Sequence, residues 1–128
     1  MIKYTQRGKI MRLKNILIVV QDIEKSKQFY HDVFGLQVIR DFGENVILSE
    51  GLVLQEKTTW DVLMNSDTVV GNGTELFFEE NCFDEFLQTI EKTTYKIEII
   101  GDVRINSWGK RVVMIKDLDG HLIEVAEA

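Results

Sequence analysis

The sequence predicts an α+β fold built from two βαβββ modules in tandem, and three observations lead to it. Each half of the chain holds an apolar strand, an amphipathic helix and three further strands, in that order. The two helices match at an offset of sixty positions, so that Ile23 corresponds to Phe83 and Tyr30 to Ile90. Hairpin signals rich in glycine and acidic residues separate the strands. Because neither module buries both faces of its strands alone, we expect a curved mixed β-sheet around a shared cleft.

The first module spans residues 13–56. Residues 15–21 (NILIVVQ) are a β-branched apolar run of strand length. Asp22 stands at the N-cap of a helix over residues 23–34. Gly35 follows, where a left-handed residue commonly ends a helix. The remaining strands of this module are expected at residues 36–41, 45–49 and 52–56.

A connector over residues 57–73 leads to the second module, residues 74–127. The connector is rich in turn-forming residues, and only its apolar run near Trp60 is compatible with a helical turn. The second module opens with a strand over residues 74–79, and Asn81 is expected to cap the next helix. That helix places Phe83, Phe86, Leu87 and Ile90 on one face. Its last three strands are expected at residues 97–105, 111–116 and 121–126.

The internal repeat extends to the strands. Asn15 and Glu75 open equivalent strands, and residues 43–48 (GENVIL) match residues 109–114 (GKRVVM). Residues 51–55 (GLVLQ) match residues 120–124 (GHLIE), which makes Gln55 the equivalent of Glu124. Tyr30 and Phe77 are assigned to the core rather than to a pocket.

Composition restricts the classes of function. The 128 residues suffice for one compact domain, expected over residues 11–128. The polar residues 1–10 form an arm, or an extension ahead of a second possible start at Met11, and receive no function. A net charge of −6 argues against a nucleic-acid or anionic-membrane partner. The single cysteine, Cys82, and the absence of an apolar run of about 18 residues favour a soluble, cytoplasmic protein.

Two motifs carry a resemblance to a known family. Residues 15–22 (NILIVVQD), Phe29-Tyr30 and residues 33–36 (VFGL) resemble the opening module of the vicinal oxygen chelate superfamily, which includes glyoxalase I, bleomycin-resistance proteins and extradiol dioxygenases. Residues 116–124 (KDLDGHLIE) resemble the closing hairpin of these proteins, with Leu118 where proline is usual. The resemblance extends from Leu13 to Glu127. It implies a small-molecule ligand or substrate and a homodimer.

The resemblance also implies a set of candidate metal ligands. Metal-using relatives hold the ion with one side chain from the first strand and one from the last strand of each module. The matching positions here are Asn15, Gln55, Glu75 and Glu124. The set contains no histidine, and its oxygen donors suit Mn²⁺, Mg²⁺ or Ca²⁺ better than Zn²⁺. In the alternative, the two amides only form hydrogen bonds and the two carboxylates only form ion pairs.

Two functions follow from these residues, and the sequence leaves both open. One is a glyoxalase-like lyase or isomerase, in which a divalent ion acts as Lewis acid and Glu75 or Glu124 moves a proton. The other is a metal-free protein that binds an organic ligand without catalysis, as antibiotic-resistance relatives do. Further candidate substrate-binding residues, at the rim of the cleft and near the end of the chain, are Trp60, Trp108, Arg104 and Arg111. A silent scaffold is the third possibility. His121, on the opposite face of its strand from Glu124, is not placed among the ligands.

Overall fold

The computed structural model describes residues 10–71 and 73–128, so most of the expected arm and Asn72 lie outside the described residues. It confirms the tandem βαβββ order. The first module consists of β1 (Ile16–Val20), α1 (Ile23–Phe34), β2 (Val38–Asp41), β3 (Asn45–Leu48) and β4 (Leu52–Glu56). A helix, α2 (Lys57–Met64), begins the connector. The second module consists of β5 (Glu75–Glu80), α3 (Phe83–Lys92), β6 (Arg104–Ile105), β7 (Arg111–Lys116) and β8 (Leu122–Glu127).

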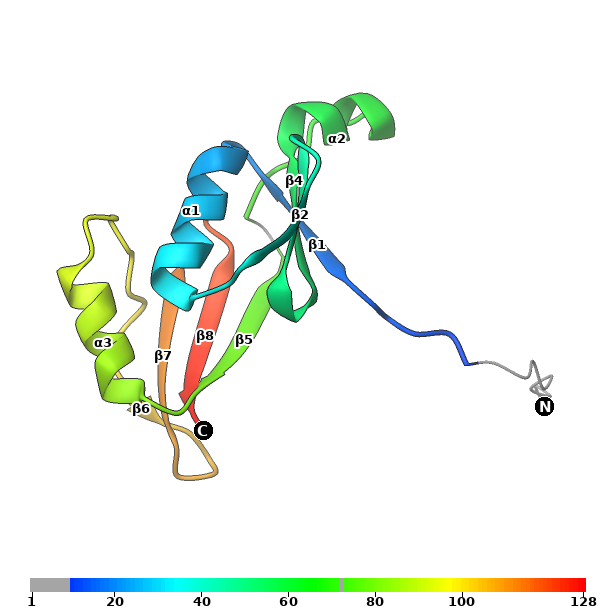
Figure 1. The fold of residues 1–128 in the computed structure, drawn as a ribbon. Helices are drawn as coiled ribbons and strands as arrows, with labels where there is room; N and C mark the ends of the chain where they lie inside the picture. The colour runs from blue at the N-terminus through cyan, green and yellow to red at the C-terminus, as the bar shows by residue number, and fades with distance from the viewer. Residues whose placement is uncertain (1–9, 72) are drawn as a thin grey trace.

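The two modules form two mixed sheets of identical topology. Their strand orders are β1-β4-β3-β2 and β5-β8-β7-β6. The β1–β4 and β5–β8 pairs are parallel, and the other pairs are antiparallel. Each module therefore leaves its first strand, β1 or β5, at the edge of its sheet (Figure 1).

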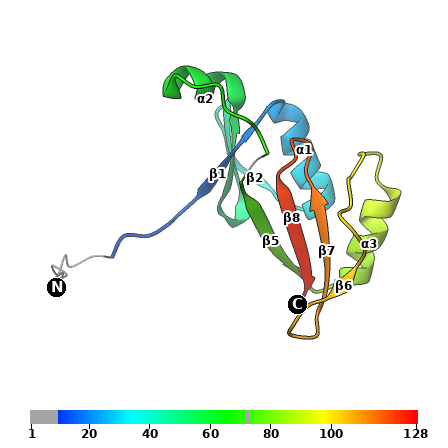
Figure 2. The same cartoon turned by 180° about the vertical axis from the view of Figure 1, so that it is seen from behind.

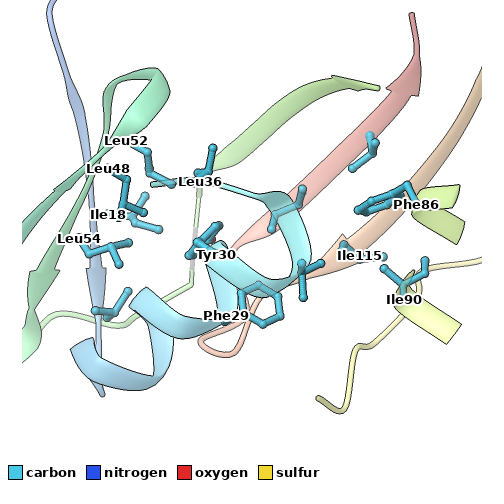
Figure 3. Packing of buried hydrophobic residues seen from close by; sticks show 14 of the residues in the cluster. Ile18, Phe29, Tyr30, Leu36, Leu48, Leu52, Leu54, Phe86, Ile90 and Ile115 are labelled. Carbon is cyan, nitrogen blue, oxygen red and sulfur yellow. The ribbon is translucent and has the colours of Figure 1, made fainter. Parts of the chain in front are cut away.

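One hydrophobic core joins the modules, and α1 lies at its centre. Phe29 and Tyr30 of α1 lie between first-module strands that carry Leu54 and second-module residues such as Ile115 and Phe86 (Figure 3). Each sheet thus turns one face inward, toward the helices. Side chains alternate along a strand, so the residues between the core positions form an outer face on each sheet. Figure 2 looks onto the second sheet from this outer side, with β5, β8 and β7 in front of α1.

Local sequence chemistry explains how α1 begins and ends. Asp22 accepts a hydrogen bond from the backbone N–H of Lys25, 3.1 Å away, as expected of an N-cap. Gly35 adopts φ 70° and closes the helix with backbone bonds to the last turn. No helix in the described part of the chain is long and apolar enough to cross a membrane.

Two expected elements differ in the structure. The strand expected at residues 97–105 is reduced to β6 and an isolated bridge between Ile99 and Ile115. Gly101 interrupts it, because its φ of 71° is incompatible with an extended strand. The N-cap of α3 is Cys82 and not the expected Asn81, and its side chain forms no capping hydrogen bond.

The strand register also corrects the internal repeat. Ile16 lies opposite Leu52, and its equivalent Leu76 lies opposite Ile123. Leu52 and Ile123 are therefore equivalent, and the next residues along β4 and β8, Val53 and Glu124, are equivalent as well. The predicted equivalence of Gln55 and Glu124 is wrong by two residues. A shift of two keeps the alternation of faces, which is why the sequence pattern did not expose it. The match of residues 43–48 with 109–114 is wrong by one, because Val46 corresponds to Val113.

Candidate functional site

A row of four chemically different side chains crosses the outer face of the second sheet. Phe77 of β5 lies opposite Glu124 of β8, and Glu124 lies opposite Met114 of β7. Arg104 of β6 pairs with Val112, on the same face, and its Nη2 donates to the Met114 Sδ at 2.9 Å. We call Phe77, Glu124, Met114 and Arg104 the outer row. The row runs from the free edge of the sheet to its other edge.

The outer row is open to a ligand. Phe77 is 54% exposed, which corrects its assignment to the core. Glu124 and Met114 are half-buried, and Arg104 is exposed. Within the described residues neither Glu124 nor Arg104 forms an ion pair, although they flank the same methionine. The row thus offers a ring face, a carboxylate and a guanidinium that are not engaged in ion pairs.

Glu75 lies beside the outer row, two residues before Phe77 and on the same face of β5. It lines the cleft between the modules, about 800 Å³ in volume, together with Asn15, the end of α1 and the turn that precedes β4. Glu75 also lines a second hollow of about 570 Å³, which Thr74, Lys116 and Leu122 border. The structure therefore brings Asn15 and Glu75 to one cleft, whereas Gln55 and Glu124 do not line it.

Gln55 has a different environment from the other three predicted ligands. It is 7% exposed, and its Oε1 accepts a hydrogen bond from the Asn45 side chain at 2.9 Å. Its neighbour on β1 is Val19, four residues beyond Asn15 and hence about 13 Å further along the strand. α2 contacts both β1 and β4, and Val19, Val53 and Gln55 are all buried. Gln55 therefore belongs to a covered, internally bonded end of the first sheet.

The four predicted ligands do not fit one metal centre in this chain. Gln55 is remote from Asn15 and bonded to Asn45, and the position equivalent to Glu124 carries the apolar Val53. Throughout residues 10–71 and 73–128, no group of three or more histidine, cysteine or carboxylate side chains is arranged to hold an ion.

The Arg111 guanidinium is held by contacts within the second module. It donates to Asp84 at 2.8 Å and to Glu127 at 3.0 Å, and lies 4.9 Å above the ring of Phe83. These hydrogen bonds to two carboxylates raise the pKa of Arg111. The contact with Phe83 of α3 places the guanidinium on the inner side of the sheet. Of the two predicted arginines, only Arg104 belongs to the outer row.

The two tryptophans lie apart from the cleft. Trp108 is 82% exposed at the turn between β6 and β7, where the Asn106 side chain accepts hydrogen bonds from the N–H groups of Trp108 and Lys110. Trp60 is half-buried on α2. Neither side chain lines the cleft between the modules.

Comparison with known proteins places the chain in a family. The glyoxalase-like domain family matches residues 13–128. The chain belongs to this family. The resemblance to the vicinal oxygen chelate superfamily is thereby confirmed, and no protein of curated function matches the chain.

Solved structures similar to this glyoxalase-like domain cover nearly its whole length. A protein of unknown function from Agrobacterium tumefaciens str. C58 is 31% identical, with 94% of this chain and 96% of that chain covered and a TM-score of 0.81. A glyoxalase-related enzyme from Fulvimarina pelagi is 17% identical, with 93% and 89% covered and a TM-score of 0.78. A glyoxalase/bleomycin resistance protein/dioxygenase family enzyme from Burkholderia phytofirmans PsJN is 17% identical, with 91% and 98% covered and a TM-score of 0.76. The last two show the fold alone.

Sequence reasoning missed the part that His121 has in this glyoxalase-like domain. The ring is 4% exposed, with Nε2 2.7 Å from the Val19 carbonyl oxygen and Nδ1 3.1 Å from the Thr74 hydroxyl. Thr74 directly precedes Glu75. The signal in the sequence was the position of His121 on the core face of its strand, where a buried histidine needs partners. Those partners come from other segments of the chain, so the sequence did not identify them.

Proposed function

We propose that this glyoxalase-like domain binds a small organic molecule along the outer row of its second sheet, without requiring a metal ion. The outer row itself is the observation that carries the proposal. It combines an exposed aromatic ring with a carboxylate and a guanidinium, and neither charge forms an ion pair within residues 10–71 and 73–128. By contrast, the donor set predicted for a metal is divided between two regions of the molecule.

Each member of the row has a distinct chemical task. The Phe77 ring offers a face for stacking against a planar ligand. The Arg104 guanidinium presents donors that match a carboxylate or phosphate. Glu124 accepts a hydrogen bond or a proton from the same ligand. A planar acid that also carries a hydrogen-bond donor matches all three, and benzoate presents the part of it that meets Phe77 and Arg104.

The experiment compares three benzene derivatives of different charge: benzoate, benzyl alcohol and benzamidine. We expect benzoate to raise the melting temperature most. Arg104→Met should weaken benzoate binding about tenfold or more, because a charge-assisted hydrogen bond contributes about 1.5–3 kcal/mol. Arg40→Met, which removes an exposed arginine from β2 of the first module, is the matched control. Absence of binding by all three compounds, or equal effects of the two substitutions, would reject the proposal.

Metal-dependent lyase or isomerase activity is the second candidate, and the meeting of Asn15 and Glu75 at one cleft is the observation that favours it. It is tested by the melting temperature in Mn²⁺, Mg²⁺, Ca²⁺ and Zn²⁺. An ion at a hundred times its dissociation constant would add about 2.7 kcal/mol of stability. An effect that disappears in Glu75→Gln would support this function over the metal-free one.

The proposed assembly is a homodimer in which a second copy covers the edge of the first sheet and leaves the outer row open. β1 lies at an edge of its sheet, and Leu17 exposes apolar surface on it. Exposed edges with apolar residues favour pairing with another chain. Light scattering over a range of concentrations should give a dimer mass, and a monomer mass at every concentration would reject this assembly.

A further inference from the structure

Buried polar side chains gather at one place between the modules. Among the described residues, the polar or charged residues that are buried are Ser26, Gln55, Asp117 and His121. All of them but Gln55 lie where the β7–β8 turn contacts the start of α1. Burying polar groups is unfavourable unless each finds a partner. Every such group here has one, which makes the contact specific in its geometry.

The turn between β7 and β8 is held by its own carboxylate. Asp117 Oδ1 accepts hydrogen bonds from the backbone N–H groups of Asp119 and His121, at 2.9 and 2.8 Å. Asp117 Oδ2 accepts a hydrogen bond from the Tyr30 hydroxyl at 2.6 Å. The same side chain therefore shapes the turn and binds it to α1 of the other module.

Asp119 and His121 extend this contact along the first module. Asp119 accepts from the backbone N–H of Gln21 at 2.9 Å and from the Ser26 hydroxyl at 3.4 Å. His121 donates from Nε2 to the Val19 carbonyl, because a carbonyl oxygen only accepts, and its Nδ1 accepts from the Thr74 hydroxyl. Three side chains of one turn thus reach β1, α1 and Thr74, the residue before β5.

The backbone of the connector lies close to the backbone of this turn. Gly71 has φ 78°, and a Cβ built there would lie 2.1 Å from the Asp119 carbonyl oxygen. Only glycine permits this approach of two backbones. The turn is therefore enclosed between the first module and the segment that leads directly into β5.

We propose that the turn from Asp117 to His121, which we call the latch, positions Glu75 and Glu124 relative to the first module. Thr74 lies immediately before β5, and His121 lies immediately before β8. The His121 ring forms one hydrogen bond with Thr74 and another with the Val19 carbonyl of β1. Glu75 is one residue beyond Thr74, and Glu124 three residues beyond His121. His121 is the central positioning residue, because its ring joins all three strands. The inference rests on the proposed function only where ligand binding is the readout.

The test measures the spacing of the modules directly. In a Trp108→Phe background, Trp60 on α2 is the single donor, and an energy-transfer acceptor is attached to Cys82, the exposed and only cysteine. Time-resolved donor decay then gives the distribution of distances between α2 and the second module. His121→Leu removes both ring hydrogen bonds, and Thr74→Val removes one without changing the shape of the side chain. Thr94→Val, an exposed threonine, is the control.

We expect both latch variants to widen the distance distribution and the control to leave it unchanged. Distributions identical to wild type in folded latch variants would overturn the proposal, and Thr74→Val decides the matter if His121→Leu does not fold. Benzoate affinity is the second readout, and Thr74→Val should leave it unchanged, because the outer row lies wholly on the second sheet. A benzoate affinity that falls about tenfold in Thr74→Val, as it should in Arg104→Met, would overturn the proposal, because the substitution would then disturb the second sheet itself and not its position relative to the first module. If benzoate does not bind the wild type, the proposed function fails while the distance measurement still tests the latch.

Discussion

The outer faces of the two modules differ although the modules share strand order, helix placement and parallel first pair. On the first sheet Val19, Val53 and Gln55 are buried, and Gln55 is bonded to Asn45. On the second sheet Phe77 is mainly exposed, and Glu124 stands where the first sheet has Val53. A duplicated fold thus allows one copy to contribute packing while the other presents side chains to a ligand.

The largest expected effect comes from placing the carboxylate of the second outer face at the equivalent position of the first, which tests whether the first outer face is closed. Val53→Glu places a carboxylate at a 5% exposed position opposite the apolar residues Leu17 and Ile47. We expect a loss of about 3 kcal/mol or more in the free energy of unfolding, measured in urea. Phe77→Glu on the open face is the control and should change stability by less than about 1 kcal/mol. Equal losses for the two variants would show that the first outer face is not closed.

A second prediction contrasts a buried contact between the modules with an exposed one. Tyr30→Phe leaves a buried oxygen of Asp117 without its donor, so the free energy of unfolding should fall by about 1–3 kcal/mol. Tyr95→Phe removes a similar 2.8 Å bond to the exposed carboxylate of Asp32 and should have a much smaller effect. Urea unfolding of both variants is the measurement. A Tyr30→Phe effect no larger than that of Tyr95→Phe would contradict the description of the latch.

The smallest expected effect concerns pH. Burial raises the pKa of Asp119, so the protonated acid is favoured in the folded protein. Its contribution to stability is fully present below the unfolded pKa of about 4 and is lost as pH rises through the higher folded pKa. Relative to Asp119→Asn, the wild type should therefore gain stability as pH falls from 7 toward 4.

Asp41 provides the opposite sign as a control. Hydrogen bonds from Lys27 and the Gly43 N–H lower the pKa of Asp41, so its contribution is present above about pH 4 and is lost as pH falls through its lower folded pKa. Relative to Asp41→Asn, the wild type should lose stability in acid. Thermal unfolding at a series of pH values measures both differences, and the same sign for both would contradict the assigned environments.

The helices and the order of elements could be predicted because their signals are local. The helical spacing of Phe83, Phe86 and Ile90 identifies a buried face in the sequence alone, and all three are buried. The register of β4 could not be predicted, because strand patterns repeat every two residues and both Val53 and Gln55 lie on the outer face. For the same reason the candidate site was only partly predicted. Glu75, Glu124 and Arg104 were identified, whereas Phe77 was assigned to the core, and its place opposite Glu124 became visible only when β5 and β8 were placed side by side.

The most direct test of the central claim is to locate a bound ligand on one outer face or the other. Backbone amide chemical shifts of the ¹⁵N-labelled protein, recorded during a titration with benzoate, provide this location. We predict that the shifts change at Phe77, Glu124 and Met114 and stay constant at Val19, Val53 and Gln55. Changes centred on the second group instead would contradict the assignment of ligand binding to the second module.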